Sequence, residues 1–222
     1  MYRWFLLAAV IIFAASPAAS ADDASSSVEV LRREGYNVRS ITPIFSQLLM
    51  LSVPKGFHGA FEVTRGRDYL QESVPKGETV DEWTQMITLT GSKDLAANPK
   101  LNPQIVAEAI AGGFKRACPS TFSGMGISTF KVSGHDAFAG VAACGTVIFR
   151  GSKQSQAALI IAIKGDADYY TVQWAERTAA VGKPVELVRD KWLDRIKALG
   201  PIKLCPIVPG EAAPYPSCIN HQ

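Results

Sequence analysis

The fold is decided by residues 137–176, AFAGVAACGTVIFRGSKQSQAALIIAIKGDADYYTVQWAE. This stretch contains three runs of apolar and β-favouring residues, at Ala137–Ile148, Ala157–Ile163 and Tyr169–Ala175. The links between the runs are short, and the second contains Gly165-Asp166, a pair suited to a hairpin turn. Short links join antiparallel neighbours, because a parallel crossover needs about a dozen residues or more. We therefore expect an antiparallel meander, with Ile127–Val132 as a further strand before it.

Working outward, two helical patterns flank this meander. Asn102 is a candidate N-cap with Pro103 at the first helical position, and the apolar spacing that follows predicts a helix to Ala117. A second helix is predicted from Pro184 to Leu199, where Gly200-Pro201 ends it. The residues Thr79 to Glu82 match a capping box and predict a third, short helix over Val80–Met86.

Three further strands are expected before that short helix, at Gln47–Val53, Ala60–Thr64 and Tyr69–Val74. Residues 28–46 give no clear pattern. The order of elements predicts an α+β fold in which helices pack on a single antiparallel sheet. We divide the chain into a signal peptide (1–21), an N-terminal lead-in (22–44), one α+β domain (45–200) and a Pro-rich tail (201–222).

The first residues have the pattern of a cleavable export signal. Arg3 precedes an apolar run from Trp4 to Ala15, and Ala19-Ser20-Ala21 offers the small residues that a signal peptidase reads. The run is shorter than the roughly 20 apolar residues that cross a bilayer. A buried N-terminal helix or an uncleaved anchor is the alternative. We expect a mature N-terminus at Asp22, a periplasmic or secreted location, and no stable membrane insertion after cleavage.

The cysteines agree with an oxidising compartment. An even number of them favours two disulfides, for which three pairings are possible. We favour Cys118–Cys144 and Cys205–Cys218 because each closes a local loop, worth about 3 kcal/mol in chain entropy. A zinc site is disfavoured, because the chain has no C-x-x-C pair.

No catalytic pattern stands out. The formal net charge of +3 and the scattered basic residues give no case for nucleic-acid binding. The histidines His58, His135 and His221 stand in loop-like or terminal contexts, and no G-x-S-x-G elbow is present. Gly124-Met125-Gly126 lacks the rest of a dinucleotide fingerprint. We expect no catalytic residue, no cofactor and no metal.

Aromatic residues supply the candidate binding surface. Trp83 and Tyr169 are the two that we single out, as possible lining of a ligand pocket. Trp83 lies at helical spacing and is expected in the core. Tyr169 faces away from Tyr170 on an alternating strand, so we expect it to be exposed.

A family resemblance starts at Glu72–Gly91, ESVPKGETVDEWTQMITLTG. The block G-E-T-x-x-x-W-x-x-M-I, followed by a helix, a sheet and a C-terminal helix, resembles the PsbP/Mog1/DcrB-like group of small α/β domains over residues 45–200. The resemblance implies an exported or envelope-associated accessory protein rather than an enzyme. It implies no catalytic residues, and the four cysteines and the Pro-rich tail depart from the group pattern.

Three functions are therefore compared. The leading hypothesis is a non-enzymatic accessory or binding domain of the cell envelope. The alternative is a small-molecule-binding protein with a pocket between sheet and helices, near Trp83 and Tyr169. A hydrolase that uses His135 or His58 is less favoured. The expected partner is an envelope protein or a small ligand, with no nucleic acid.

Overall fold

The computed structural model describes residues 38–220. The expected signal peptide, its cleavage site and His221 lie outside the described residues. Within residues 38–220, no helix has the length and apolar character needed to cross a membrane.

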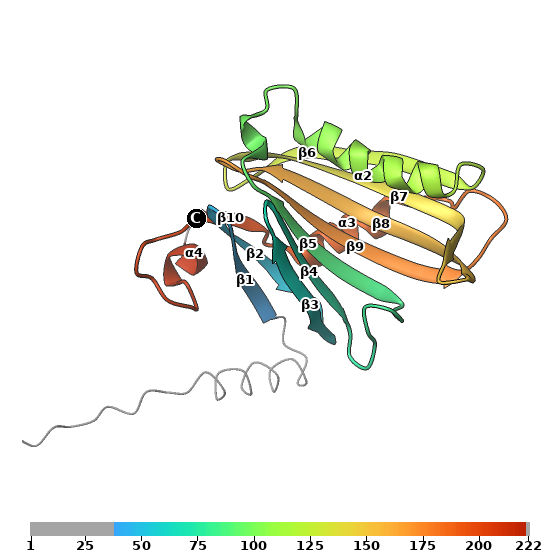
Figure 1. Ribbon diagram of the computed structural model, residues 1–222, viewed down its shortest axis with the longest axis horizontal. Coiled ribbons are helices and arrows are strands. Elements are labelled where there is room, and N and C mark those ends of the chain that lie inside the picture. The colour runs from blue at the N-terminus through green and yellow to red at the C-terminus, as the bar shows by residue number, and fades with distance from the viewer. Residues whose placement is uncertain (1–37, 221–222) are drawn as a thin grey trace, which may run out of the picture.

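The predicted meander is confirmed and forms four of the seven strands of a large antiparallel sheet. Its strands are β6 (Phe122–Val132), β7 (His135–Phe149), β8 (Ser152–Lys164) and β9 (Tyr169–Ala179). Three earlier strands complete it, namely β3 (Phe57–Arg65), β4 (Asp68–Pro75) and β5 (Gln85–Ser92). The spatial order of the seven strands is β3-β4-β5-β9-β8-β7-β6, so β3 and β6 are the edges (Figure 1).

A second, three-stranded sheet corrects the expectation of a single sheet. It contains β1 (Val38–Ile44), β2 (Gln47–Val53) and β10 (Lys203–Pro206), in the order β1-β2-β10. Six of the seven residues of β2 are buried, so both of its faces need a cover. The large sheet covers one face, and the C-terminal tail covers the other. The pairing with β10 joins segments far apart in the chain, which local patterns do not reveal.

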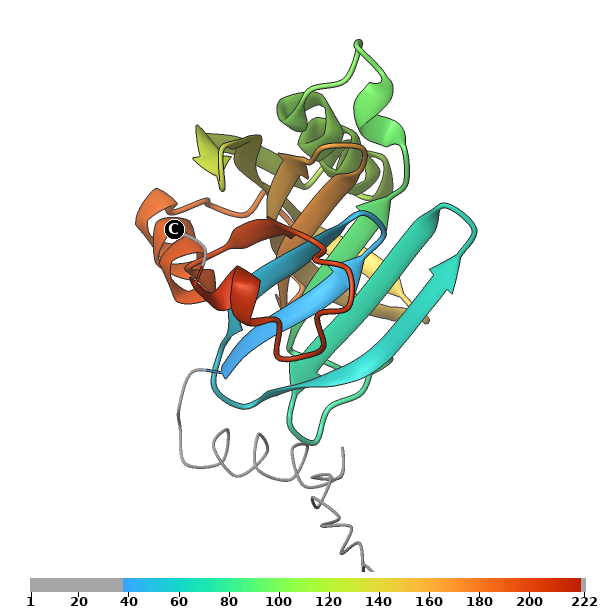
Figure 2. The ribbon, with the colours of Figure 1, turned by 90° about the vertical axis from the view of Figure 1, so that its left-hand side faces the viewer.

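The structure also shows where the lead-in and the tail lie. β1 falls within the segment that we treated as an N-terminal lead-in, and β10 falls within the Pro-rich tail. Both pair with β2 over several residues and belong to the folded body. Figure 2 shows this small sheet in front of the large one, with the tail folded across it.

Two helices pack on opposite faces of the large sheet. Helix α2 (Pro103–Ala117) has the predicted bounds, and the side chain of Asn102 accepts a hydrogen bond from the amide of Ile105 at 2.9 Å. Helix α3 (Arg189–Leu199) begins later than predicted, because residues 180–188 form an extended strap along the sheet. A 3-10 turn, η1 (Leu95–Ala97), precedes α2, and a short helix, α4 (Pro216–Asn220), ends the tail.

The short helix predicted over Val80–Met86 is wrong. The hydroxyl of Thr79 does accept a hydrogen bond from the amide of Glu82 at 3.1 Å, as a capping box requires. The Thr79 amide, however, donates to the carbonyl of Glu82 at 3.0 Å, which closes a tight loop. The chain then enters β5 at Gln85, because pairing with β9 satisfies its backbone better than one helical turn would.

Two of the three hydrophobic cores formed by residues 38–220 lie on the two faces of the large sheet. In β8, Leu159, Ile161 and Ile163 face the small sheet and α3, whereas Ala158, Ile160 and Ala162 face α2. Burial on both faces explains why this strand is continuously apolar rather than alternating. The order of layers is therefore α2, the large sheet, and then the small sheet with α3 beside it (Figure 1).

Helix α3 is held by a charged and aromatic cluster. Trp192 is buried in the main core. The guanidinium of Arg195 lies near the rings of Trp174 and Trp192, with its carbon 4.8 and 5.0 Å from the ring centroids. Arg195 also pairs with Glu176 at 2.5 Å. These contacts join α3 to β9.

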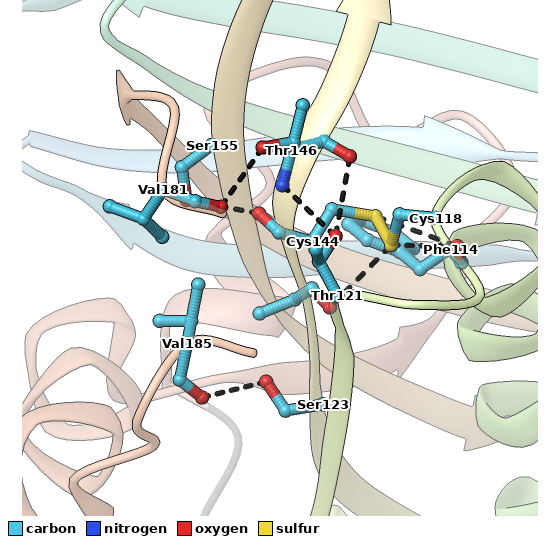
Figure 3. The surroundings of a disulfide bond; sticks show 10 residues. Phe114, Cys118, Thr121, Ser123, Cys144, Thr146, Ser155, Val181 and Val185 are labelled. Atoms are coloured by element: carbon cyan, nitrogen blue, oxygen red, sulfur yellow. Dashed lines mark hydrogen bonds between the residues drawn. A yellow bond between two sulfur atoms is a disulfide. The ribbon is translucent and has the colours of Figure 1, made fainter. Parts of the chain in front are cut away.

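Both disulfides have the predicted pairing. Cys118–Cys144 joins the end of α2 to β7, and Cys205–Cys218 joins β10 to α4. Around the first bond, the Thr146 amide donates to the hydroxyl of Thr121, and the Thr146 hydroxyl donates to the carbonyl of Val181 (Figure 3). The hydroxyl of Ser123 donates to the carbonyl of Val185 at 2.7 Å. The strap at 180–188 is thereby tied to β6 and β7.

Candidate functional site

A groove lies between α2 and the edge strand β6. Its volume is about 420 Å³. Helix α2 packs chiefly over β7 and β8, so the sheet beyond β7 remains open along β6. The lining comes from α2 (Gln104, Ala107, Glu108, Ala111, Gly112, Lys115), β6 (Phe122, Gly124, Met125, Gly126), β7 (Phe138, Gly140, Val141) and β8 (Ile160).

Glycines make the floor of the groove. Gly124 and Gly126 are two residues apart on β6 and so point to the same face of the sheet. A Cβ at Gly126 would meet the ring of Phe138 at 3.5 Å, an ordinary contact, so a side chain there is tolerated and would occupy groove space. On β7, a Cβ at Gly140 would meet the Phe138 ring at 3.2 Å and the Met125 carbonyl at 3.3 Å. The groove exists because these positions lack side chains.

The walls are apolar and the polar groups lie on the helix side. Phe122 and Phe138 are half-buried beside the α2 core, and Ala107 and Ile160 are buried beneath it. Gln104, Glu108 and Lys115 are exposed along the rim. Apolar walls with a few polar groups are typical of sites for small molecules, whose volumes are about 300–1,000 Å³.

The polar residues along the rim of the groove differ in charge and in hydrogen bonding. The side-chain amide of Gln104 donates to the carboxylate of Glu108 at 2.8 Å, which partly satisfies the only acid of the lining. Lys115 and Arg116 stand in the last turn of α2. A guanidinium nitrogen of Arg116 lies 3.3 Å from the position that a Cβ of Gly112 would take. Positive charge therefore gathers at the C-terminal end of the groove.

The chemistry of this lining suits binding. None of its residues is His, Cys, Ser, Thr or Tyr. Among residues 38–220, no group of three or more His, Cys, Asp and Glu side chains could hold a metal ion. The groove offers dispersion contacts and burial of apolar area, with charges at its rim.

Tyr169 is not part of an exposed surface, and the expectation that it is exposed is wrong. Only 1% of the residue is accessible, and its hydroxyl has no hydrogen-bond partner among the described residues. Alternation along β9 predicts two faces but not which face is covered. Here both faces of the large sheet are covered, one on the side of α2 and the other by the small sheet. Tyr169 and Tyr170 are therefore both buried, although they point to opposite faces.

Trp83 lies at the opposite end of β9 from Tyr169. The guanidinium carbon of Arg177 lies 3.6 Å from the centroid of the Trp83 ring and 4.2 Å from that of Phe149. Trp83 is partly buried against the α2 core. A hollow of about 350 Å³ beside it is lined by its own loop, residues 77–84. Trp83 and Tyr169 therefore do not line a common pocket. The contact between Trp83 and Arg177 of β9 packs the loop of residues 77–84 against the large sheet.

The histidines have no catalytic arrangement around them in the described structure. Nε2 of His135 lies 3.4 Å from Nε2 of the buried Gln47, and its Nδ1 lies 3.9 Å from a carboxylate oxygen of the exposed Asp166. His58 lies on the edge strand β3, and its buried Nδ1 has no partner among residues 38–220. Within residues 38–220, neither imidazole forms a hydrogen bond with a hydroxyl or thiol group.

Asp168 is the most densely bonded acid that the structure describes. One carboxylate oxygen accepts from the amide and hydroxyl of Ser46, at 3.1 and 2.5 Å, and from the hydroxyl of Tyr170 at 3.2 Å. The other accepts from the amide of Asp94 at 2.7 Å. Burial by itself raises the pKa of Asp168, but these hydrogen bonds outweigh it and lower the pKa below its usual value. The carboxylate joins three turns and has a structural role.

The groove is not evident from the sequence, in which Gly124-Met125-Gly126 resembles only part of a dinucleotide fingerprint. The useful signal is the spacing: two glycines at alternate positions of a strand remove side chains from one face. Which element lies over that face depends on where α2 packs, and the sequence does not give that placement.

Comparisons with known proteins bear on the fold. No family model and no curated protein matches this chain. Among solved structures, the chain is similar to the Ran-binding protein Mog1p of Saccharomyces cerevisiae, with 11% identity over 75% of this chain and 86% of that chain, at a TM-score of 0.39. It is also similar to PsbP (CyanoP) of Synechocystis sp. PCC 6803, with 12% identity over 74% and 88% of the two chains, at a TM-score of 0.39. Mog1p and PsbP are two of the proteins that give their names to the group that residues 45–200 resemble.

Proposed function

We propose that this chain is an exported, non-enzymatic binding domain and that the α2–β6 groove is its binding site. The observation that supports this most directly is the groove itself, about 420 Å³ with apolar walls and a floor of glycines. Glycine in a strand interior weakens the strand, so its repeated use on β6 and β7 has a cost that an open binding surface would explain.

Export is the second part of the proposal. The N-terminal signal pattern and the two disulfides support it, because disulfides persist in oxidising compartments such as the periplasm or the extracellular space. Outside the cytoplasm, a groove of this kind would meet apolar molecules of the envelope or segments of envelope proteins. The groove lies away from Trp83 and Tyr169, so the proposed site differs from the one that the sequence suggested.

The test is to fill the groove. Gly126→Val adds a β-favourable side chain over Phe138 without backbone strain, since no positive φ is recorded at Gly126. Binding of a neutral apolar fluorophore, N-phenyl-1-naphthylamine, to the purified protein is then measured by titration. We expect the variant to bind at least tenfold more weakly than the wild type. Ala111→Leu fills the groove from the helix side and is expected to act in the same way.

Ser128→Val is the matched control. Ser128 is also exposed on β6 but does not line the groove. The Ser128→Val substitution should leave both the affinity for the probe and the midpoint of thermal unfolding unchanged. The proposal fails if the wild type does not bind the probe, or if the two groove-filling variants bind it as tightly as Ser128→Val does.

A further inference from the structure

We infer that the ligand of the groove is a single-chain amphiphile with an anionic headgroup, bound with its aliphatic chain over the glycine floor and its headgroup at Lys115 and Arg116. This inference rests on the proposed function and names the class of ligand that the groove would take. It follows from how charge is distributed along α2.

The two ends of the groove differ in charge. Gln104 lies in the first turn of α2, Glu108 one turn later, and Lys115 with Arg116 in the last turn. The chain then passes through Cys118 and enters β6 at Phe122, so the cationic end of the groove lies beside the start of that strand. The lining therefore has an amide and an acid at one end and Lys115 at the other, where the guanidinium of Arg116 lies next to the lining residue Gly112.

The acid at the first end already has a partner. The Glu108 carboxylate accepts from the Gln104 amide at 2.8 Å, and both residues belong to the lining. No ion pair is recorded for Lys115 or Arg116 within residues 38–220. Their ammonium and guanidinium groups present several donors, suited to a carboxylate or phosphate. Charge complementarity therefore favours an anion at this end.

The shape of the space between the charges favours a chain. The lining follows α2 for three turns, and its floor offers Gly124, Gly126 and Gly140 without a polar side chain among them. Each CH₂ group that a hydrocarbon chain buries adds to the free energy of binding, so an extended apolar groove favours a long chain. A headgroup without a chain would find only exposed cations, whose single contacts in water contribute little.

The experiment compares headgroups at constant chain length. Dodecanoate, dodecanol and dodecylamine are titrated against the protein loaded with N-phenyl-1-naphthylamine, below their aggregation limits. For the wild type we expect dodecanoate to displace the probe at a concentration at least tenfold lower than dodecylamine, with dodecanol between them. In Lys115→Gln/Arg116→Gln this preference for the anionic headgroup should disappear.

A matched charge control separates a local effect from a global one. Lys55→Gln/Arg65→Gln removes the same two charges from exposed positions flanking the opposite edge of the sheet. It should retain the preference for dodecanoate. Equal displacement by the acid and the amine in the wild type would overturn the headgroup inference and leave the groove intact. Failure of the probe to bind at all would instead overturn the proposed function.

The last arm distinguishes a free amphiphile from a membrane surface. Vesicles of phosphatidylglycerol are mixed with the wild type and with Gly126→Val, and the bound fraction is measured by flotation. We expect little binding, or binding that Gly126→Val abolishes. Strong vesicle binding that Gly126→Val leaves unchanged, while the basic double variant loses it, would overturn the inference in favour of a basic surface that recognises lipid headgroups from outside.

Discussion

At the scale of single residues, Gly145 shows how one missing side chain positions a segment. Its amide donates to the carbonyl of Thr121 at 2.9 Å, and its carbonyl accepts from the amide of Val181 at 2.8 Å. A Cβ at Gly145 would lie 1.9 Å from the carbonyl oxygen of Lys183. The strap at 180–188 can pass over β7 only because this residue is glycine.

Gly145→Ala is therefore expected to displace the strap. Overpacking of this kind costs about 1–3 kcal/mol. Trp192 and Leu199 would still anchor α3, so the protein should fold while residues 180–188 become more sensitive to protease. Limited proteolysis with mass mapping measures the sensitivity of residues 180–188, and thermal unfolding measures the loss of stability.

Gly59→Ala provides the control for this substitution. No atom lies within 4 Å of the position that a Cβ of Gly59 would take, and the residue is exposed on β3. Its digestion pattern should match that of the wild type. Equal protease sensitivity of Gly145→Ala and the wild type would contradict the account of the strap.

Asp168 predicts a pH dependence of stability. Because hydrogen bonds hold its folded pKa below the unfolded value of about 3.9, the carboxylate stabilises the fold above that pH. The stabilisation disappears as the pH falls from about 4 through the folded pKa. Asp168→Asn replaces an acceptor by a donor facing the Ser46 or Asp94 amide, so we expect a loss of about 1–3 kcal/mol at pH 7.

Urea unfolding of both proteins at pH 7, 4 and 2.5 tests this prediction. The difference in free energy of unfolding between wild type and variant should be largest at pH 7 and shrink towards pH 2.5. Asp68→Asn is a suitable control, because Asp68 is an exposed acid that forms no ion pair within residues 38–220. A difference that stays constant with pH would show that the charge of Asp168 has no part in its role.

At the scale of elements, the two disulfides are expected to have separate effects. Cys118–Cys144 spans 26 residues and holds the C-terminal end of α2 against β7, beside the groove. Cys205–Cys218 spans 13 residues and holds the tail against the far face of the small sheet. Chain entropy gives each of them about 3 kcal/mol, slightly more for the longer loop.

Replacing each pair by alanine separates stability from binding. Both double variants should lose about 3 kcal/mol in denaturant unfolding. Only Cys118→Ala/Cys144→Ala should also weaken binding of N-phenyl-1-naphthylamine, because it releases the helix end that forms one wall of the groove. Equal probe affinities in the two variants would mean that this bond does not organise the groove.

At the scale of the whole molecule, the C-terminal tail is an integral part of the folded domain. β10 pairs with β2 in the register Leu204 to Leu49 and Cys205 to Leu48. Cys205 and Cys218 are buried with Leu48 and Met50 in a small core of their own. The small sheet therefore needs residues from both ends of the described chain.

Export also belongs to this scale. If residues 1–21 are a signal peptide, the exported product begins at Asp22, and its four cysteines are oxidised. Intact-mass and N-terminal sequencing of the protein from the periplasm or medium, with and without reduction, measures both properties. Recovery of a product that retains Met1, or of four free thiols, would contradict the proposed export.

Local patterns in the sequence determined much of this protein. Apolar runs and short links gave the meander, Asn102-Pro103 gave the start of α2, and loop length gave the disulfide pairing. Each of these depends on neighbours in the chain, whose preferences act before the chain has folded.

The tertiary structure alone decided the rest. The split into two sheets depends on β2 meeting β10, the burial of Tyr169 depends on both faces of β9 being covered, and the failed helix at Val80–Met86 depends on β5 pairing with β9. The groove likewise exists only because α2 packs over β7 and β8 and leaves the glycines of β6 uncovered. These features arise from contacts between distant segments, whose burial free energy outweighs local preference.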